Sequence, residues 1–232
     1  MLPCFLCKHF KGGQMVSFED IKNNESVRTY IKAADESLNA LGYTEHSFAH
    51  VTRVAETASN ILLSLGYSPR EAELAKIAGY LHDIGNLVNR EEHSQSGAVI
   101  AFRILDKLGM SAEEIAAIVT AIGNHDEGNG VPVSALAAAL IIADKTDVRR
   151  TRVRNDEQIS FDIHDRVNFS VVHSQISLDK PGIIELSIDI DTDISSVTEY
   201  FEIFLGRMLL CRRAAEKLGV SFTFNVNGQR LM

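Results

Sequence analysis

The chain lacks the features that mark several classes of protein. Its three cysteines, Cys4, Cys7 and Cys211, are spaced too unevenly for a disulfide framework, which favours a reducing cytoplasm. No apolar run is long enough to span a bilayer, so a membrane protein is not expected. Positive charge is also scarce. The formal net charge of -8 argues against binding to a nucleic-acid duplex or an anionic membrane.

Several enzyme signatures are missing as well. The sequence has no G-x-S-x-G elbow, no P-loop and no G-x-G-x-x-G turn, and it has no internal repeat or low-complexity tract. What remains is the balance of an ordinary soluble globular protein, with 45% hydrophobic and 23% charged residues. A chain of 232 residues is long enough for one large domain, or for one domain with a small appendage.

Residues 1–14, MLPCFLCKHFKGGQ, differ in character from the rest of the chain. Cys4, Cys7 and His9 have the spacing of half a zinc site, but no second pair follows downstream. The segment is too short for a secretory leader. Lys-Gly-Gly-Gln before Met15 can be encoded by a purine-rich run that resembles a bacterial ribosome-binding site. We therefore expect an N-terminal extension over residues 1–24, with Met15 as a candidate native start.

The spacing of apolar residues between 25 and 155 predicts a helical domain. Helices are expected over residues 27–41, 46–65, 69–83, 93–108, 112–124 and 132–150. The run Ser68-Pro69-Arg70-Glu71 combines an N-cap, a first-turn proline and a capping-box glutamate, and Ser111 with Glu114 forms a second predicted capping box. Gly42, Gly66 and Gly109 follow three of the predicted helices and indicate where they end.

The pattern changes to that of strands in residues 160–232. Residues 169–178 suit a strand, and residues 183–191 alternate between apolar and polar side chains. A turn at Lys180-Pro181-Gly182 would join the two into a hairpin. A helix is expected over residues 197–209, followed by a strand over 220–226. These elements predict a small β-β-α-β module. Its role is left open between covering the helical core, forming the sheet of a homodimer and binding an effector.

Ligand-type side chains gather at the helix ends and apolar faces of the helical part. His82 and Asp83 close the apolar stretch GYLHDIGN, and Asp144 follows ALAAALIIA, where an isolated buried carboxylate would be costly. A bound dication removes that cost, because it accepts imidazole nitrogen and carboxylate oxygen. Successive helical residues differ by about 100° around the axis, so neighbours in the chain can both reach a cation beyond a helix end. The full set is His46, His50, His82, Asp83, His93, His125, Asp126 and Asp144.

The order His50, His82-Asp83, Asp144, each on a different predicted helix, resembles the H…HD…D signature of the HD-domain metal-dependent phosphohydrolases. The surrounding stretches HVTRVAETA, AGYLHDIGN and LIIADKTD agree with it. The resemblance covers roughly residues 25–155. It implies a mainly α fold, an HD-domain helical bundle, to which the chain adds the small C-terminal α+β module. It also implies that His50, His82, Asp83 and Asp144 hold a first metal ion.

Two further histidines make the sequence similar to superfamily members with two metal ions, such as dinucleoside-polyphosphate hydrolases and HD-GYP phosphodiesterases. They are His93 in EHSQSGA and His125 in IGNHDEGNG. By this analogy Asp83 would bridge two ions, and His93 and His125 would hold the second. One or two ions of iron or manganese are expected, with magnesium, cobalt, nickel or zinc also compatible. The short stretch between Asp83 and His93, and the valine in GNGVP where the HD-GYP family has tyrosine, argue against cyclic-di-GMP as the substrate.

The resemblance implies a cytoplasmic phosphohydrolase that uses a metal-activated hydroxide on a phosphoester or phosphoanhydride, expected to belong to a nucleotide. Asp83 and Lys145 are the predicted catalytic residues, and Lys145 and Arg149 the predicted substrate-binding residues. His46 and Asp147 are expected to support the ligands. The arginines from Arg149 to Arg154 are interpreted as a solvated helix end, close enough to clamp a phosphate. The alternative is a nucleotide-sensing or scaffolding protein that binds metal with little turnover.

Overall fold

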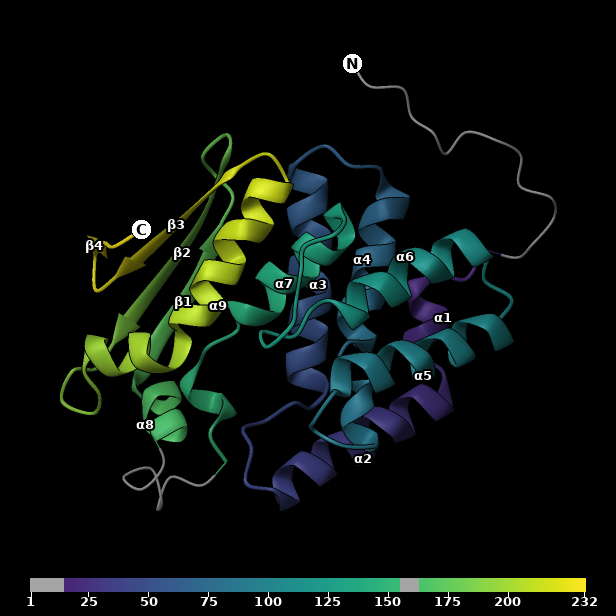
Figure 1. The fold of residues 1–232 in the computed structure, drawn as a ribbon, viewed down its shortest axis with the longest axis horizontal. Coiled ribbons are helices and arrows are strands. Elements are labelled where there is room, and N and C mark those ends of the chain that lie inside the picture. The colour runs from purple at the N-terminus through teal and green to yellow at the C-terminus, as the bar shows by residue number, and fades with distance from the viewer. Residues whose placement is uncertain (1–14, 155–162) are drawn as a thin grey trace.

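The computed structural model describes residues 15–154 and 163–232 (Figure 1). The cysteine and histidine residues of the half zinc site therefore lie outside the described residues. The helical part consists of α1 (Phe18–Lys22), α2 (Glu25–Ala40), α3 (Phe48–Ser64), α4 (Pro69–Leu81), α5 (His93–Lys107), α6 (Ala112–Gly123) and α7 (Ala135–Lys145), with short 3-10 helices η1 (Ile84–Leu87) and η2 (Arg150–Arg152). The C-terminal part consists of α8 (Ile163–Ser170), β1 (Val171–Ser177), β2 (Ile183–Ile190), α9 (Val197–Lys217), β3 (Ser221–Val226) and β4 (Gln229–Arg230).

Helix α7 lies at the centre of the helical part. Residues 136–143 of this helix are all buried, and it packs against α3, α4, α6 and α9. Its many alanines allow this, because a small side chain lets a neighbouring helix approach from any direction. The helix has only 11 residues, and no helix in the described residues is long and apolar enough to cross a bilayer.

Helices α3 and α4 pack closely because of a glycine. A Cβ atom added to Gly79 would lie 2.7 Å from the Cα atom of Ala55, which is closer than real Cβ contacts. The glycine thus allows the backbones of the two helices to approach each other. Since His50 lies near the start of α3 and His82 caps the end of α4, this packing also places two of the predicted metal ligands.

The two predicted capping boxes differ in outcome. At α4 the box is complete, because Ser68 accepts from the backbone of Glu71 and the Glu71 side chain accepts from the backbone of Ser68. At α6 Ser111 accepts from the Glu114 backbone, as predicted. The Glu114 carboxylate, however, binds the Arg70 guanidinium at 2.6 and 2.7 Å. The Glu114 carboxylate thus pairs with Arg70 of α4, and not with the backbone N–H of Ser111 as a capping box requires.

The helix predicted over residues 132–150 is shorter in the structure. Helix α7 ends at Lys145, where the Thr146 hydroxyl donates a 2.7 Å hydrogen bond to the Ile142 carbonyl. The chain leaves the helix here, and the next side chain, Asp147, hydrogen-bonds to His50. The end of α7 thus coincides with a contact to α3, the helix of His50. The apolar periodicity of residues 132–150 does not indicate this contact.

Other elements also differ from the sequence prediction, among them α9, which continues to Lys217, beyond the predicted end at residue 209. Helix α4 ends at Leu81, and Asp83 precedes the 3-10 helix η1. The strand predicted from residue 169 begins two residues later, because Phe169 still belongs to α8, a helix that the sequence pattern did not indicate. Helix α1 lies inside the segment treated as an N-terminal extension, yet Phe18 is buried against Tyr80, with ring centroids 5.5 Å apart.

The C-terminal sheet has the strand order β1-β2-β3-β4. Strands β1 and β2 form the predicted antiparallel hairpin, β3 pairs in parallel with β2 after the crossover through α9, and β4 pairs antiparallel with β3. Residues of β2 alternate as predicted, with Ile184, Leu186 and Ile188 buried. Helix α9 contacts both β3 and α7, so it lies between the sheet and the helical part (Figure 1). The predicted β-β-α-β module is confirmed, with α8 and β4 added.

Candidate metal centre

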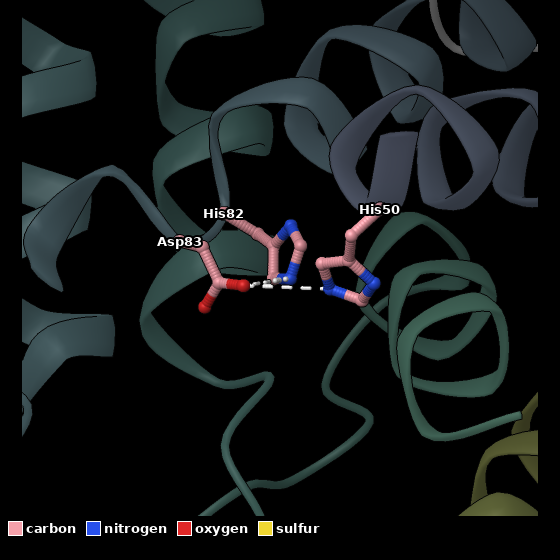
Figure 2. A group of neighbouring side chains, drawn as sticks. All are labelled: His50, His82 and Asp83. Carbon is pink, nitrogen blue, oxygen red and sulfur yellow. Dashed lines mark ion pairs between the residues drawn. The ribbon is translucent and has the colours of Figure 1, made fainter. Parts of the chain in front are cut away.

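His50, His82 and Asp83 bring three polar atoms together inside the helical part (Figure 2). His50 comes from α3, and the other two residues come from the junction between α4 and η1. Oδ2 of Asp83 lies 3.4 Å from Nε2 of His50 and 3.1 Å from Nε2 of His82. All three atoms are buried and have no hydrogen-bond partner among the described residues. Such atoms are costly to bury alone, and a cation that accepts a lone pair from each would satisfy them.

Asp144 reaches the same centre from α7. Its Oδ1 atom lies 3.4 Å from Nε2 of His50 and 3.6 Å from Nε2 of His82. Its Oδ2 atom pairs with the Lys145 ammonium at 2.7 Å. The structure thus brings together all four residues of the predicted H…HD…D set, although they come from three separate segments of the chain.

His93 and His125 form a second group next to the first. Their Nε2 atoms lie 3.3 Å apart, and Oδ1 of Asp83 lies 3.5 Å from Nε2 of His93. Oδ2 of Asp83 therefore faces His50 and His82, whereas its Oδ1 faces His93, as in a ligand shared by two ions. Asp126, which the sequence analysis included in the ligand-type set without a specific role, also lies close by, with its Oδ1 atom 4.0 Å from Nε2 of His93. The groups whose ligand atoms all lie within 4.8 Å of one another are His50–His82–Asp83, His82–His125–Asp144 and Asp83–His93–His125.

All four histidines present the same ring nitrogen to the centre. In each ring Nδ1 lies at hydrogen-bond distance from a carbonyl or carboxylate oxygen, which can only accept, so Nδ1 carries the proton and Nε2 keeps its lone pair. The pairs are His50 with Asp147 Oδ2 at 2.7 Å, His82 with the Gly79 carbonyl at 2.8 Å, His93 with the Arg90 carbonyl at 3.1 Å and His125 with the Ile122 carbonyl at 2.6 Å. These partners orient the rings, the role predicted for Asp147.

The two carboxylates of the centre, Asp83 and Asp144, favour a positive charge beside them. Burial alone would lower the pKa of His82, but the Asp83 and Asp144 carboxylates raise that pKa to about 10. Burial, together with the charges of His82 and Lys145, lowers the pKa of His125 to about 3. The carboxylates thus favour a positive charge at the centre. A dication bound by the same atoms would supply it.

The centre opens into a pocket of about 590 Å³, a size typical of small-molecule sites. Asp83, His93, Asp144 and Lys145 line it. Helices α8 and α9 of the C-terminal module contribute His164, Asp165, Asn168, Phe204 and Arg207 to the same lining. The module therefore covers the helical part and supplies a wall of the pocket. Arg207 also binds Glu127, the loop residue after Asp126, through two hydrogen bonds of 2.7 and 3.1 Å.

Arg149 and His46 take different places relative to the pocket. The Arg149 guanidinium binds Asp147 at 2.9 Å and Glu45 at 3.3 Å, and it is not among the residues that line the pocket. It contacts Asp147, the residue that orients His50, and its predicted role in substrate binding stays a prediction. His46 does line the pocket, and its ring centroid lies 5.3 Å from that of His50.

Two arginines that were not among the predicted substrate-binding residues also line the pocket, Arg90 and Arg152. Arg152, interpreted as part of a solvated helix end, is buried, because the predicted helix ends early and the chain folds back over the site. Arg90 lies in the loop between η1 and α5, where no periodicity applies. Neither position carries a local sequence signal. Only the clustering of arginines after Asp144 could have suggested Arg152.

Comparison with known proteins agrees with this geometry. Residues 47–149 match the family model of the HD domain, and this segment contains the whole H…HD…D set. This match identifies residues 47–149 as an HD domain, and it supports the broad class of metal-dependent phosphohydrolases. The chain is 26% identical over 208 residues to the uncharacterized protein MJ1020 of Methanocaldococcus jannaschii, covering 78% of this chain and 80% of that protein. It is also similar to the crystal structure of a predicted HD superfamily hydrolase from an uncultured Thermotogales bacterium, with 24% identity, 57% of this chain and 72% of that chain covered, and a TM-score of 0.44.

Proposed function

We propose that the protein hydrolyses a phosphoester or phosphoanhydride bond of a nucleotide. The observation that carries this proposal is the set of buried, partnerless atoms, Nε2 of His50, Nε2 of His82 and Oδ2 of Asp83, which face one centre beside the pocket. A donor set rich in imidazole suits iron or manganese better than magnesium, which prefers oxygen ligands.

The residues would share the work as follows. His50, His82, Asp83 and Asp144 would hold one cation, and His93 and His125 with the second oxygen of Asp83 would hold another. When bound, divalent cations supply a nucleophilic hydroxide near neutral pH and neutralise charge on a phosphoryl group. Lys145 lines the pocket beside Asp144, so its ammonium can contact a phosphoryl oxygen as negative charge develops.

A nucleotide fits the remaining surface of the pocket. The volume of about 590 Å³ leaves room for a group larger than the phosphoryl that reacts. Tyr43 lines the pocket and is 45% exposed, and its ring offers a flat apolar face on which a base can stack. The Arg90 guanidinium carbon lies 5.6 Å from the centre of that ring and supports this orientation.

The test begins with anaerobic purification and elemental analysis, followed by a screen of nucleotides and phosphoesters with the metal found. Chelation is expected to abolish hydrolysis, and Asp83→Asn is expected to reduce it to background. Asp189→Asn makes the same change at an exposed position of β2 and is the matched control. Full activity in Asp83→Asn would refute the proposal. Bound metal and tight nucleotide binding, with no hydrolysis across the screen, would favour the sensing role.

A further inference from the structure

A groove separate from the metal centre lies between α2 and α5 (Figure 1). Its volume is about 680 Å³, and none of its lining residues lines the pocket beside the metal ligands. The 3-10 helix η1 packs against both helices and contributes Leu87 and Val88 to the lining. Val88 is 67% exposed, and Val99, on α5, is 69% exposed. Exposed apolar side chains gathered at one groove mark a site of interaction.

Helix α5 and its C-cap residue present two rows of side chains to this groove. The half-buried inner row consists of Ile100, Ile104 and Leu108. The exposed outer row consists of Val99, Arg103 and Lys107. Each row repeats every four residues, the spacing of neighbours along one side of a helix. The rows run over about two and a half helical turns, so the groove is long and apolar, with a basic rim.

The charge of the groove is opposite to that of the protein as a whole. The chain has a formal net charge of -8, yet the described residues that line the groove include two cations, Arg103 and Lys107, and no aspartate or glutamate. Neither cation forms an ion pair with a carboxylate in residues 15–154 and 163–232. Both charges therefore remain available to a partner, and a positive site on an acidic protein favours an acidic one.

A second copy of this chain fits the groove poorly. In a dimer with two-fold symmetry through the groove, the same surface would face itself. Arg103 and Lys107 would then meet a lining without a carboxylate, and like charges brought together weaken an interface. The occupant should therefore carry the opposite charge from the groove.

We propose that the groove binds an amphipathic helix of a partner protein, with apolar side chains against the inner row and aspartate or glutamate against the outer row. A helix that lies in an apolar groove presents side chains at i, i+3, i+4 and i+7, and the four-residue repeat of the α5 rows matches this spacing. About nine residues of such a helix would cover the length of the two rows. This interaction does not involve the metal centre and goes beyond the proposed function.

The proposal can be tested with two synthetic peptides that carry a fluorescent label. Both have leucine at i, i+3, i+4 and i+7 over about 14 residues, and they differ only in having glutamate or lysine at the flanking positions. Binding to full-length protein is measured by fluorescence anisotropy at low and high salt. The glutamate peptide is expected to bind about tenfold more tightly at low salt, and the difference should shrink as salt screens the rim charges.

Reversal of the rim charge should reverse the preference. The double variant Arg103→Glu, Lys107→Glu is expected to bind the lysine peptide more tightly than the glutamate peptide. Both side chains are exposed, so the variant should fold, which its circular dichroism and melting temperature check. Arg212→Glu with Arg213→Glu is the matched control, because these residues are exposed on α9 and do not line the groove. It has the same net charge and should keep the preference for glutamate.

Removal of apolar surface should weaken the binding of both peptides. Val99→Ser leaves the charges intact and is expected to reduce the affinity for each peptide about threefold to fivefold. The proposal is overturned if neither peptide binds the wild type or if the two bind equally well. It is also overturned if the control loses its preference as the double variant does, because the overall charge would then be responsible. Sedimentation of the protein alone tests for a dimer, and one that Val99→Ser dissociates would assign the groove to a second copy instead.

Discussion

Nδ1 of His50 donates a 2.7 Å hydrogen bond to Oδ2 of Asp147, although the two residues are 97 positions apart in the chain. The bond points Nε2 of His50 at Asp83 and Asp144. Asp147 is itself held by Arg149, at 2.9 Å. The centre is thus supported by a chain of polar contacts that extends outward from the ligands, and its members can be removed one at a time.

Asp147→Asn should weaken metal binding without removing a ligand. The amide can still accept from Nδ1 of His50, but it no longer carries the charge that makes the imidazole a stronger donor. We expect about 10- to 100-fold lower metal affinity, measured by competition with a fluorescent chelator. Arg149→Gln leaves the bond between His50 and Asp147 intact and should have a smaller effect. An equal loss of metal affinity in both variants would show that the ion pair between Asp147 and Arg149 supports the site, and not the charge of Asp147 by itself.

Gly85→Ala should destabilise the protein. A Cβ atom at this position would overlap the His93 carbonyl oxygen and lie 2.5 Å from the Gly97 nitrogen, so η1 could not pack against α5. The expected loss is about 1–3 kcal/mol in the free energy of unfolding, measured by chemical denaturation. Gly206→Ala, in α9 with nothing within 4 Å, is the control and should stabilise by about 0.5–1 kcal/mol. Similar effects of the two changes would argue against the close packing of η1.

Arg207→Gln should alter substrate binding through the loop that follows His125. Arg207 lines the pocket and binds Glu127 with two hydrogen bonds, so its loss frees that loop and changes one wall of the pocket. We expect KM to rise more than kcat falls, measured by steady-state kinetics on the best substrate. Glu127→Gln should reproduce part of the effect, because the pair is partly exposed and worth only about 0.2–1 kcal/mol. A fall in kcat alone would contradict a binding role.

Glu199 should make stability depend on pH in the acid range. Its carboxylate accepts from the Ser196 backbone at 2.8 Å and pairs with Arg166 at 2.6 Å, and these contacts lower its pKa from 4.5 to about 2. A depressed pKa stabilises the folded state above the unfolded value, and this contribution is lost as pH falls from about 4.5 towards 2. The wild type should therefore unfold at a higher temperature than Glu199→Gln near pH 7, with the gap closing in acid. Glu202→Gln, an exposed change on the same helix, is the control.

Thermal unfolding of the three proteins across the acid range measures this contribution. A difference between the wild type and Glu199→Gln that stays the same near pH 7 and at about pH 2.5 would show that the carboxylate charge is not what stabilises the start of α9.

Much of the helical part was predictable because its signals are local. Apolar periodicity and capping residues depend on neighbours within one or two turns, so most helices of residues 25–145 lie close to where the sequence places them. The residues of the H…HD…D set could be named from their order alone. Their distances could not, because they depend on how α3, α4 and α7 pack, including the close approach at Gly79.

The parts that could not be predicted depend on distant partners. Helix α7 ends where Asp147 turns to His50, and α8 has a weak apolar pattern of only 8 residues. Arg90 and Arg152 reach the pocket from a loop and from a 3-10 helix, where no sequence period shows which way a side chain points. The use of the C-terminal module as a pocket wall likewise depends on the docking of α9 on α7.

Strand β3 is an interior strand, bonded to β2 on one side and to β4 on the other. It also packs against α9, where the rings of Tyr200 and Phe224 have centroids 5.7 Å apart. During synthesis on the ribosome, α9 can dock on α7 but lacks the support of β3 until residues 221–226 have left the exit tunnel, long after every residue of the H…HD…D set has emerged. The ligand cluster can form early, but the pocket wall that α9 contributes is fully supported only after β3 is available. Affinity tags placed directly after Met232 would lie next to this late-forming strand.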